Sequence, residues 1–138
     1  MRKITIVFLF FTLVSFGQNM DEYQWKNRVL LVFADEKNSD ELKLQIQVLE
    51  NNKAKLKERK IVVYKILPSF FNFNFEDNWQ SSSKYFEKFN PNKTKFKVML
   101  IGLDGGIKLE QIQILSTEKL FVLIDGMPMR KREIRNEK

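Results

Sequence analysis

The apolar positions of the chain fall into short runs separated by one long amphipathic stretch. Residues Arg28–Ala34 (RVLLVFA) are continuously apolar and rich in β-branched residues, which predicts a buried strand. Ser39 is a suitable N-cap for a helix that extends to about Arg59. The apolar residues that recur at helical spacing in this stretch are Leu42, Ile46, Leu49 and Leu56. A second apolar run, Ile61–Leu67, ends at Pro68 and predicts a second strand.

The second half of the chain predicts a hairpin followed by a helix. Phe96–Leu103 and Ile107–Ile114 are strand-like and are separated by Asp104-Gly105-Gly106, whose residues tolerate the positive φ of a tight turn. The two strands are therefore expected to be antiparallel. Ser116 is expected to cap a last helix that ends near Asp125, because Gly126 and Pro128 follow it.

Two segments carry weaker patterns. Ser69–Lys95 is rich in Phe, Asn and Ser and is expected to be mostly irregular, with a short helix over Ser81–Phe89. Met129–Lys138 is highly charged and is expected to fray.

The order of these elements is β-α-β, a connection, and then β-β-α. A strand-helix-strand unit is parallel with a right-handed crossover, and a hairpin with a covering helix completes the sheet. This order predicts an α/β domain with a central mixed sheet and helices on both faces, in the thioredoxin-like arrangement. The pattern alone also permits another small α/β sheet.

Three stretches resemble a bacterial family known as domain of unknown function 4174. They are Trp25–Arg28, Leu100–Gly106 together with Lys108, and Ile124–Arg130, and the pair Glu58-Arg59 also fits. The resemblance implies a thioredoxin-like, peroxiredoxin-related fold and no assigned activity. One departure is Leu103, where the family pattern usually has lysine, which weakens an anion-binding role for that loop. In true thioredoxins the redox site lies between the first strand and the first helix, which here is Asp35–Ser39.

The start of the chain resembles a secretory signal peptide. Arg2 and Lys3 precede an apolar run over Ile4–Val14, and small residues, Ser15 and Gly17, precede Gln18. The run is shorter than the roughly 20 residues of a membrane-spanning helix, so cleavage is favoured over an uncleaved anchor. We expect a signal peptide over residues 1–17 and a mature domain over residues 18–138. The protein is then exported, periplasmic or secreted, without stable membrane insertion.

Composition excludes several kinds of chemistry. The 138 residues contain no Cys and no His, so thiol exchange and imidazole catalysis are excluded.

The net charge of +7 suits an envelope protein or an anionic ligand as partner, although solubility alone explains such a charge. No nucleic-acid partner is expected, because the charge is mild and no recognition motif is present. No cofactor and no metal are expected; the acidic pairs Asp35-Glu36 and Asp40-Glu41 suit a helix N-terminus better than a calcium site.

The candidate binding residues come from two places. The aromatic members are Phe71, Phe73, Phe75 and Trp79, and the basic members are Arg130 and Arg132. The Phe side chains are expected either to cover the core beneath a long connection or to form an exposed strip that docks a partner. Asp125 is expected to form a structural ion pair with Arg130 or with Arg28, and an anion clamp is the alternative.

Two functions from different classes remain at this point. The first is a non-redox binding or structural module of the cell envelope. The second is a cysteine-independent enzyme that acts on a small anionic substrate through carboxylate and Arg or Lys groups.

Overall fold

The computed structural model describes residues 23–137, so the expected signal peptide, residues 1–17, lies outside the described residues. A six-stranded mixed sheet forms the centre of the molecule, with the strand order β4-β3-β2-β1-β5-β6. The strands are β1 (Arg28–Ala34), β2 (Ile61–Ile66), β3 (Phe70–Phe73), β4 (Trp79–Ser81), β5 (Phe96–Ile101) and β6 (Ile107–Gln111). The helices are α1 (Asp40–Glu50), α2 (Lys53–Glu58), α3 (Lys84–Phe89), α4 (Thr117–Asp125) and α5 (Pro128–Asn136).

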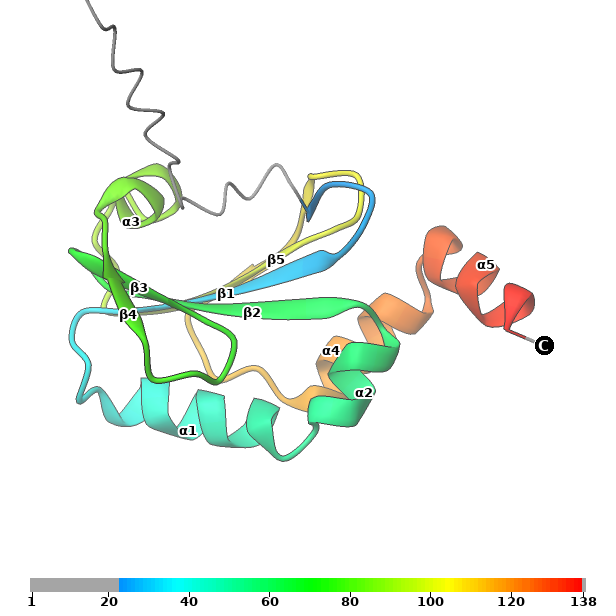
Figure 1. The fold of residues 1–138 in the computed structure, drawn as a ribbon, viewed down its shortest axis with the longest axis horizontal. Coiled ribbons are helices and arrows are strands. Elements are labelled where there is room, and N and C mark those ends of the chain that lie inside the picture. The colour runs from blue at the N-terminus through cyan, green and yellow to red at the C-terminus, as the bar shows by residue number, and fades with distance from the viewer. Residues whose placement is uncertain (1–22, 138) are drawn as a thin grey trace, which may run out of the picture.

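The sheet has helices on both faces, as the element order predicts. β1 and β2 are parallel, and β5 pairs with both β1 and β6 in the antiparallel sense. The helices α1, α2 and α4 lie below the sheet in Figure 1, and α3 lies above it. The thioredoxin-like α/β arrangement expected from the sequence is confirmed.

β1 is the central strand, and all seven of its residues are buried. Leu30, Val32 and Ala34 face the core that contains α1, α2 and α4. Their neighbours Val29, Leu31 and Phe33 face a second core that contains α3. A strand with apolar side chains on both faces requires cover on both sides, so the continuous apolar run already implies the three-layer arrangement.

The expected single helix from Ser39 to Arg59 is in fact two helices. Its start is confirmed, because the Ser39 hydroxyl accepts a hydrogen bond from the backbone N–H of Leu42. The break occurs at Asn51 and Asn52, where the Asn52 side chain donates to the backbone carbonyl of Val48. An asparagine side chain that bonds to nearby backbone competes with the helical hydrogen bonds, which explains the interruption.

The segment Ser69–Lys95 contains more regular structure than the sequence predicts. The segment contains the hairpin of β3 and β4 as well as α3, which begins at Lys84 rather than at Ser81. β3 pairs with β2 because Phe71 and Phe73 alternate, and both side chains pack on the core of α3. Asn74 then takes a φ of 60°, which ends the strand.

The expected fraying of the tail from Met129 is also wrong. Residues Pro128–Asn136 form α5, which lies beyond the end of the sheet where β1 and β2 begin (Figure 1). Proline is favoured at the first helical position, where its missing N–H is not needed. The inward side of α5 carries charged groups, Arg130 and Glu133, so no apolar stripe reveals the helix in the sequence.

Candidate functional site

The place of the thioredoxin redox site is occupied here by a polar loop beside an aromatic cleft. Asp35–Asn38, which connects β1 to α1, is exposed and carries no thiol. A cleft of about 360 Å³ lies between this loop and the β2–β3 turn. Its lining consists of Asp35–Lys37, Leu67–Phe70 and Trp79. In open α/β sheets the carboxyl ends of the parallel strands are the usual place for a ligand, and β1 and β2 end at this cleft.

Two lysines flank the indole of Trp79. The Nζ atoms of Lys37 and Lys65 lie 5.0 and 5.2 Å from the ring centroid. Partial burial lowers the pKa of Lys65, and the charge of Lys37 adds to this effect, whereas Asp77 and Glu50 oppose it. The indole N–H of Trp79 donates a hydrogen bond of 3.3 Å to Asp77. The cleft therefore combines an apolar surface with two cations, and one carboxylate lies next to the indole.

The aromatic residues selected from the sequence are divided between the two faces of the sheet. Phe71 is buried, with its ring centroid 5.2 Å from that of Tyr85, and Phe73 lies 5.1 Å from Tyr64 by the same measure. Phe75 and Trp79 are half-buried and pack against the other core, below the sheet. The structure thus favours the core alternative for Phe71 and Phe73. Phe70, which is 46% exposed, is the member of the segment that faces solvent in the cleft.

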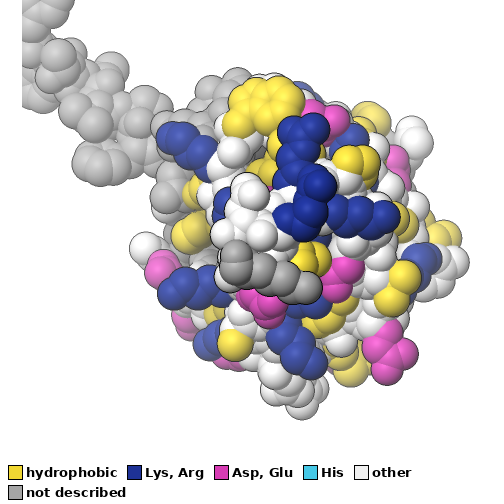
Figure 2. Space-filling view, turned by 90° about the vertical axis from the view of Figure 1, so that its right-hand side faces the viewer, with side chains coloured by type: hydrophobic (Ala, Val, Ile, Leu, Met, Phe, Trp, Pro, Cys, Tyr) yellow, Lys and Arg dark blue, Asp and Glu magenta, His cyan; other side chains and the backbone are white. Residues whose placement is uncertain are grey.

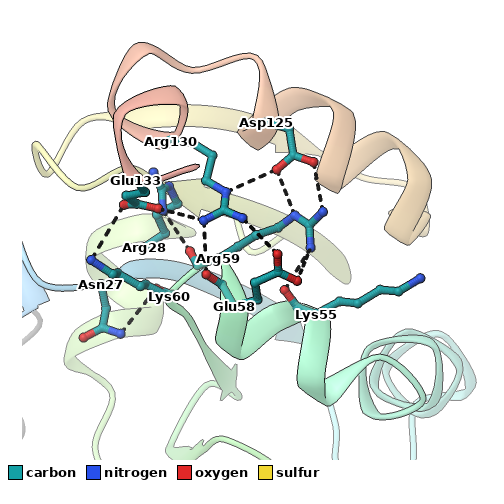
Figure 3. Close-up of polar contacts among 9 residues, drawn as sticks. All are labelled: Asn27, Arg28, Lys55, Glu58, Arg59, Lys60, Asp125, Arg130 and Glu133. Atoms are coloured by element: carbon teal, nitrogen blue, oxygen red, sulfur yellow. Dashed lines mark hydrogen bonds and ion pairs between the residues drawn. The ribbon is translucent and has the colours of Figure 1, made fainter. Parts of the chain in front are cut away.

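Arg130, the first of the two basic candidates, lies at the opposite end of the sheet. It belongs to a cluster of three arginines and three carboxylates (Figure 3). Arg130 is only 2% exposed and bonds to Asp125, Glu133 and Glu58 at 3.4, 3.2 and 3.3 Å. Arg59 holds Asp125 with two parallel bonds of 3.0 and 2.9 Å, and its guanidinium lies over the ring of Phe121. A bidentate arginine–carboxylate pair fixes geometry as well as charge.

Of the two alternative partners expected for Asp125, the structure brings Arg130 to it and not Arg28. Asp125 does bond to Arg130, but its principal partner is Arg59, and it does not bond to Arg28. Arg28 bonds instead to Glu133, with an Nη1–Oε1 distance of 3.2 Å. Glu133 was missed because the tail was expected to fray, although the spacing of Arg130 and Glu133 is that of a helical i,i+3 pair.

These bonds set the protonation of the cluster. The hydrogen bond from Arg59 is the main cause that lowers the pKa of Asp125, against an opposing effect of burial. Burial alone would lower the pKa of Arg130, but its bonds to Glu133 and Asp125 outweigh burial and raise it. Asp125 and Arg130 therefore stay charged, and the cluster ties α5 and the end of α4 to the end of α2 and the start of β1.

The remaining cations on this end of the molecule are exposed. Figure 2 looks at the end that carries α5 and shows Lys and Arg side chains gathered in the middle of the face. Arg132 belongs to this surface together with Lys131 and Arg135 of the same helix. A separate groove of about 580 Å³ beside α2 has Lys53, Lys57 and Lys60 in its lining. The aromatic and basic candidates therefore lie at opposite ends of the sheet rather than in one site.

A smaller pocket adjoins the arginine cluster. Its volume is about 300 Å³, and its lining includes Arg28, Gly102–Asp104, Lys108 and Met127–Met129. These residues come from the three sequence stretches that carry the family resemblance. At the rim of the pocket Lys108 bonds to Asp104 at 2.8 Å, and this bond is the main cause that lowers the pKa of the Asp104 carboxyl.

Among residues 23–137, no group of three or more acidic side chains is arranged to hold a metal ion. Over the same range, no helix has the length and apolar character needed to cross a membrane.

Comparison with known proteins agrees with this architecture. A solved structure described as reduced 2-Cys peroxiredoxin from Plasmodium vivax superposes with a TM-score of 0.60 at 13% sequence identity. The alignment covers 83% of this chain and 72% of the peroxiredoxin chain. No protein with a curated description matches the chain. Residues 19–133 match a family described as domain of unknown function DUF4174, and the chain therefore belongs to this family, with a thioredoxin-like fold.

Proposed function

We propose that this protein is an exported binding module of the cell envelope, which uses the thioredoxin-like fold for recognition rather than for thiol chemistry. The observation that carries the proposal is the cleft at the carboxyl ends of β1 and β2. At this cleft Phe70, Trp79 and two lysines lie in or beside the Asp35–Asn38 loop, which carries no thiol.

The chemistry of the cleft fits an extended peptide of another protein. Leu67, Pro68 and Phe70 offer an apolar surface for one bulky side chain. Lys37 and Lys65 favour an acidic residue next to that side chain. Trp79 begins β4, which is the edge strand of the sheet, so an extended peptide can add to this edge through its backbone.

The alternative, a cysteine-independent enzyme, finds less support in the titratable groups. Asp104 and Asp125 are the described carboxylates whose pKa is displaced, and both are displaced downward. A general base works best with a pKa near the working pH, which requires the opposite displacement. Both groups are instead suited to holding a cation in place.

Selection of a displayed random-peptide library against the purified protein tests the proposal. We expect selected peptides to share a bulky apolar residue next to Asp or Glu. Their binding should be lost in Phe70→Ala and in Lys37→Glu, both of which change exposed side chains and should leave the fold intact. Val122→Ala is the matched control, because Val122 is 76% exposed on α4, outside the cleft. Peptides that bind Phe70→Ala as well as the parent protein would contradict the proposed site.

The proposal also requires export and an absence of thiol turnover. Protein purified from its native host should have an intact mass that starts near Gln18, and a mass that includes residues 1–17 would contradict export. Insulin-reduction and peroxide-consumption assays should stay at background, because the sequence holds no Cys.

A further inference from the structure

Arg28 lines the pocket beside the arginine cluster, and its guanidinium has a buried edge that no group within residues 23–137 uses. Arg28 is 1% exposed, and its Nη1 atom already bonds to the carbonyl of Arg59 and to Glu133. Its Nε and Nη2 atoms are buried and have no hydrogen-bond partner in the part of the chain that the structure describes. An unsatisfied buried donor is destabilising, and natural proteins rarely retain one without a reason. Nε and Nη2 together form the edge of a guanidinium that accepts a carboxylate with two parallel bonds.

The start of α5 adds a second feature that favours an anion. Met127 is the N-cap of this helix and supplies no capping hydrogen bond from its side chain, and Pro128 at the first position has no N–H. The first turn of a helix carries free N–H groups and the positive end of the helix dipole. Met127, Pro128 and Met129 are all part of the pocket lining, so this helix end borders the same pocket as Arg28.

The side-chain charges around the pocket favour a ligand group with a single negative charge. Arg28 already has one carboxylate partner in Glu133, and Lys108 has one in Asp104. The pocket therefore offers hydrogen-bond donors without a large excess of positive charge, which suits a carboxylate better than a phosphate dianion. The rest of the lining, Leu103 and the methionines, is apolar.

We propose that this pocket is a binding site for the carboxylate of a small organic acid with a short apolar chain. The acid group is held by the Nε–Nη2 edge of Arg28 at the start of α5, and the chain lies against Leu103, Met127 and Met129. Because Arg28 is almost fully buried, the ligand reaches it by displacing the half-buried Met127 or Met129. Methionine side chains are unbranched and adapt to such a displacement.

Titration of the ¹⁵N-labelled protein with hexanoate, followed by NMR, tests this site directly. We expect saturable shifts of the Arg28 Nε–H resonance and of the backbone amides of Leu103 and Met129, with a Kd below about 1 mM. Hexanol, which has the same chain without the charge, should produce no such shifts. A hexanoate titration that does not saturate by about 10 mM would overturn the proposal, and so would equal shifts with hexanol.

Variants separate this pocket from the other basic surfaces. Arg28→Lys keeps the charge but removes the planar edge, so we expect at least about tenfold weaker binding. Met129→Trp, which fills the apolar part and leaves Arg28 in place, should abolish binding and serves if Arg28→Lys does not fold. Lys57→Ala, in the groove beside α2, is the matched control and should bind like the parent protein.

The class of anion is tested in the same way. Inorganic phosphate or sulfate should perturb Arg28 more weakly than hexanoate, and tighter binding of either would overturn the assignment to a carboxylate. The inference does not depend on the peptide cleft, because none of these variants lies in the lining of that cleft.

Discussion

Arg28 and Glu133 are 105 positions apart in the chain, and their side chains meet at an Nη1–Oε1 distance of 3.2 Å. Arg28 is the first residue of β1, and Glu133 lies in α5. The other oxygen of the same carboxylate accepts a bond of 3.2 Å from Arg130, so one acidic group serves two buried arginines. This carboxylate therefore ties the last helix to the first strand.

Glu133→Gln should be strongly destabilising. The substitution leaves two arginines, 1% and 2% exposed, without the carboxylate that they share, and removal of one partner of a buried pair costs about 3 kcal/mol. Denaturant unfolding measures the change in the free energy of unfolding. Glu137→Gln, at an exposed position near the end of the same helix, is the control and should be nearly neutral. A loss below about 0.5 kcal/mol for Glu133→Gln would mean that the bond behaves like a surface ion pair.

Asp125 should contribute to stability in a pH-dependent way. Its pKa is lower in the folded protein than in the unfolded chain, mainly because of the bond from Arg59. The contribution is therefore fully present above the unfolded pKa of about 3.9 and is lost as the pH falls through the lower folded value. Unfolding midpoints measured from neutral pH down to about pH 2.5 should fall less steeply on the acid side in Asp125→Asn than in the parent protein. Parallel curves for the two proteins would exclude a role for this carboxyl in acid unfolding.

The aromatic segment should separate into core and surface positions. Phe71 is 5% exposed and packs against Tyr64 and Tyr85, so Phe71→Ala should cost about 3–5 kcal/mol. The neighbouring Phe70 is 46% exposed, and Phe70→Ala should cost less than about 1 kcal/mol. Thermal melts of the two variants compare the melting temperatures for a core position and a surface position of the same strand. Similar melting temperatures would show that β3 is not packed as described.

Asn72, which lies between Phe71 and Phe73, should be replaceable by an apolar residue without loss of stability. It is 0% exposed, and neither its Nδ2 nor its Oδ1 atom has a hydrogen-bond partner among the described residues. Replacing an unsatisfied buried amide by a side chain of similar shape removes a desolvation penalty, so Asn72→Leu should leave the free energy of unfolding unchanged or raise it by about 1 kcal/mol. Asn72→Ala, which removes the volume as well, should be less stable than Asn72→Leu. If Asn72→Leu is clearly less stable than the parent protein, the amide makes a stabilising bond to buried water.

Several elements of this fold follow directly from local sequence. The six apolar residues that follow Arg28 in β1 require cover on both faces, and Ser39 and Ser116 each cap the helix that follows them. The Asp104-Gly105-Gly106 turn places β5 and β6 side by side, with Gly105 at a φ of 82°. These features depend on residues only a few positions apart, so a single sequence contains the information that determines them.

The arginine cluster and the two candidate sites depend on tertiary structure. Arg59, Asp125, Arg130 and Glu133 are charged residues in stretches with little apolar periodicity, and many pairings among them are compatible with the sequence. Only the packing of α4 and α5 against the starts of β1 and β2 selects Arg59 for Asp125 and Glu133 for Arg28. The same packing leaves one edge of Arg28 buried and, within residues 23–137, unpaired beside a partly apolar pocket. The sequence by itself determined β1, β2, β5 and β6, the helix caps and the absence of a thiol, because each depends on nearby residues or on composition. Tertiary structure decided which charges meet, because the energy of an ion pair depends on the distance and burial of groups that are far apart in the chain.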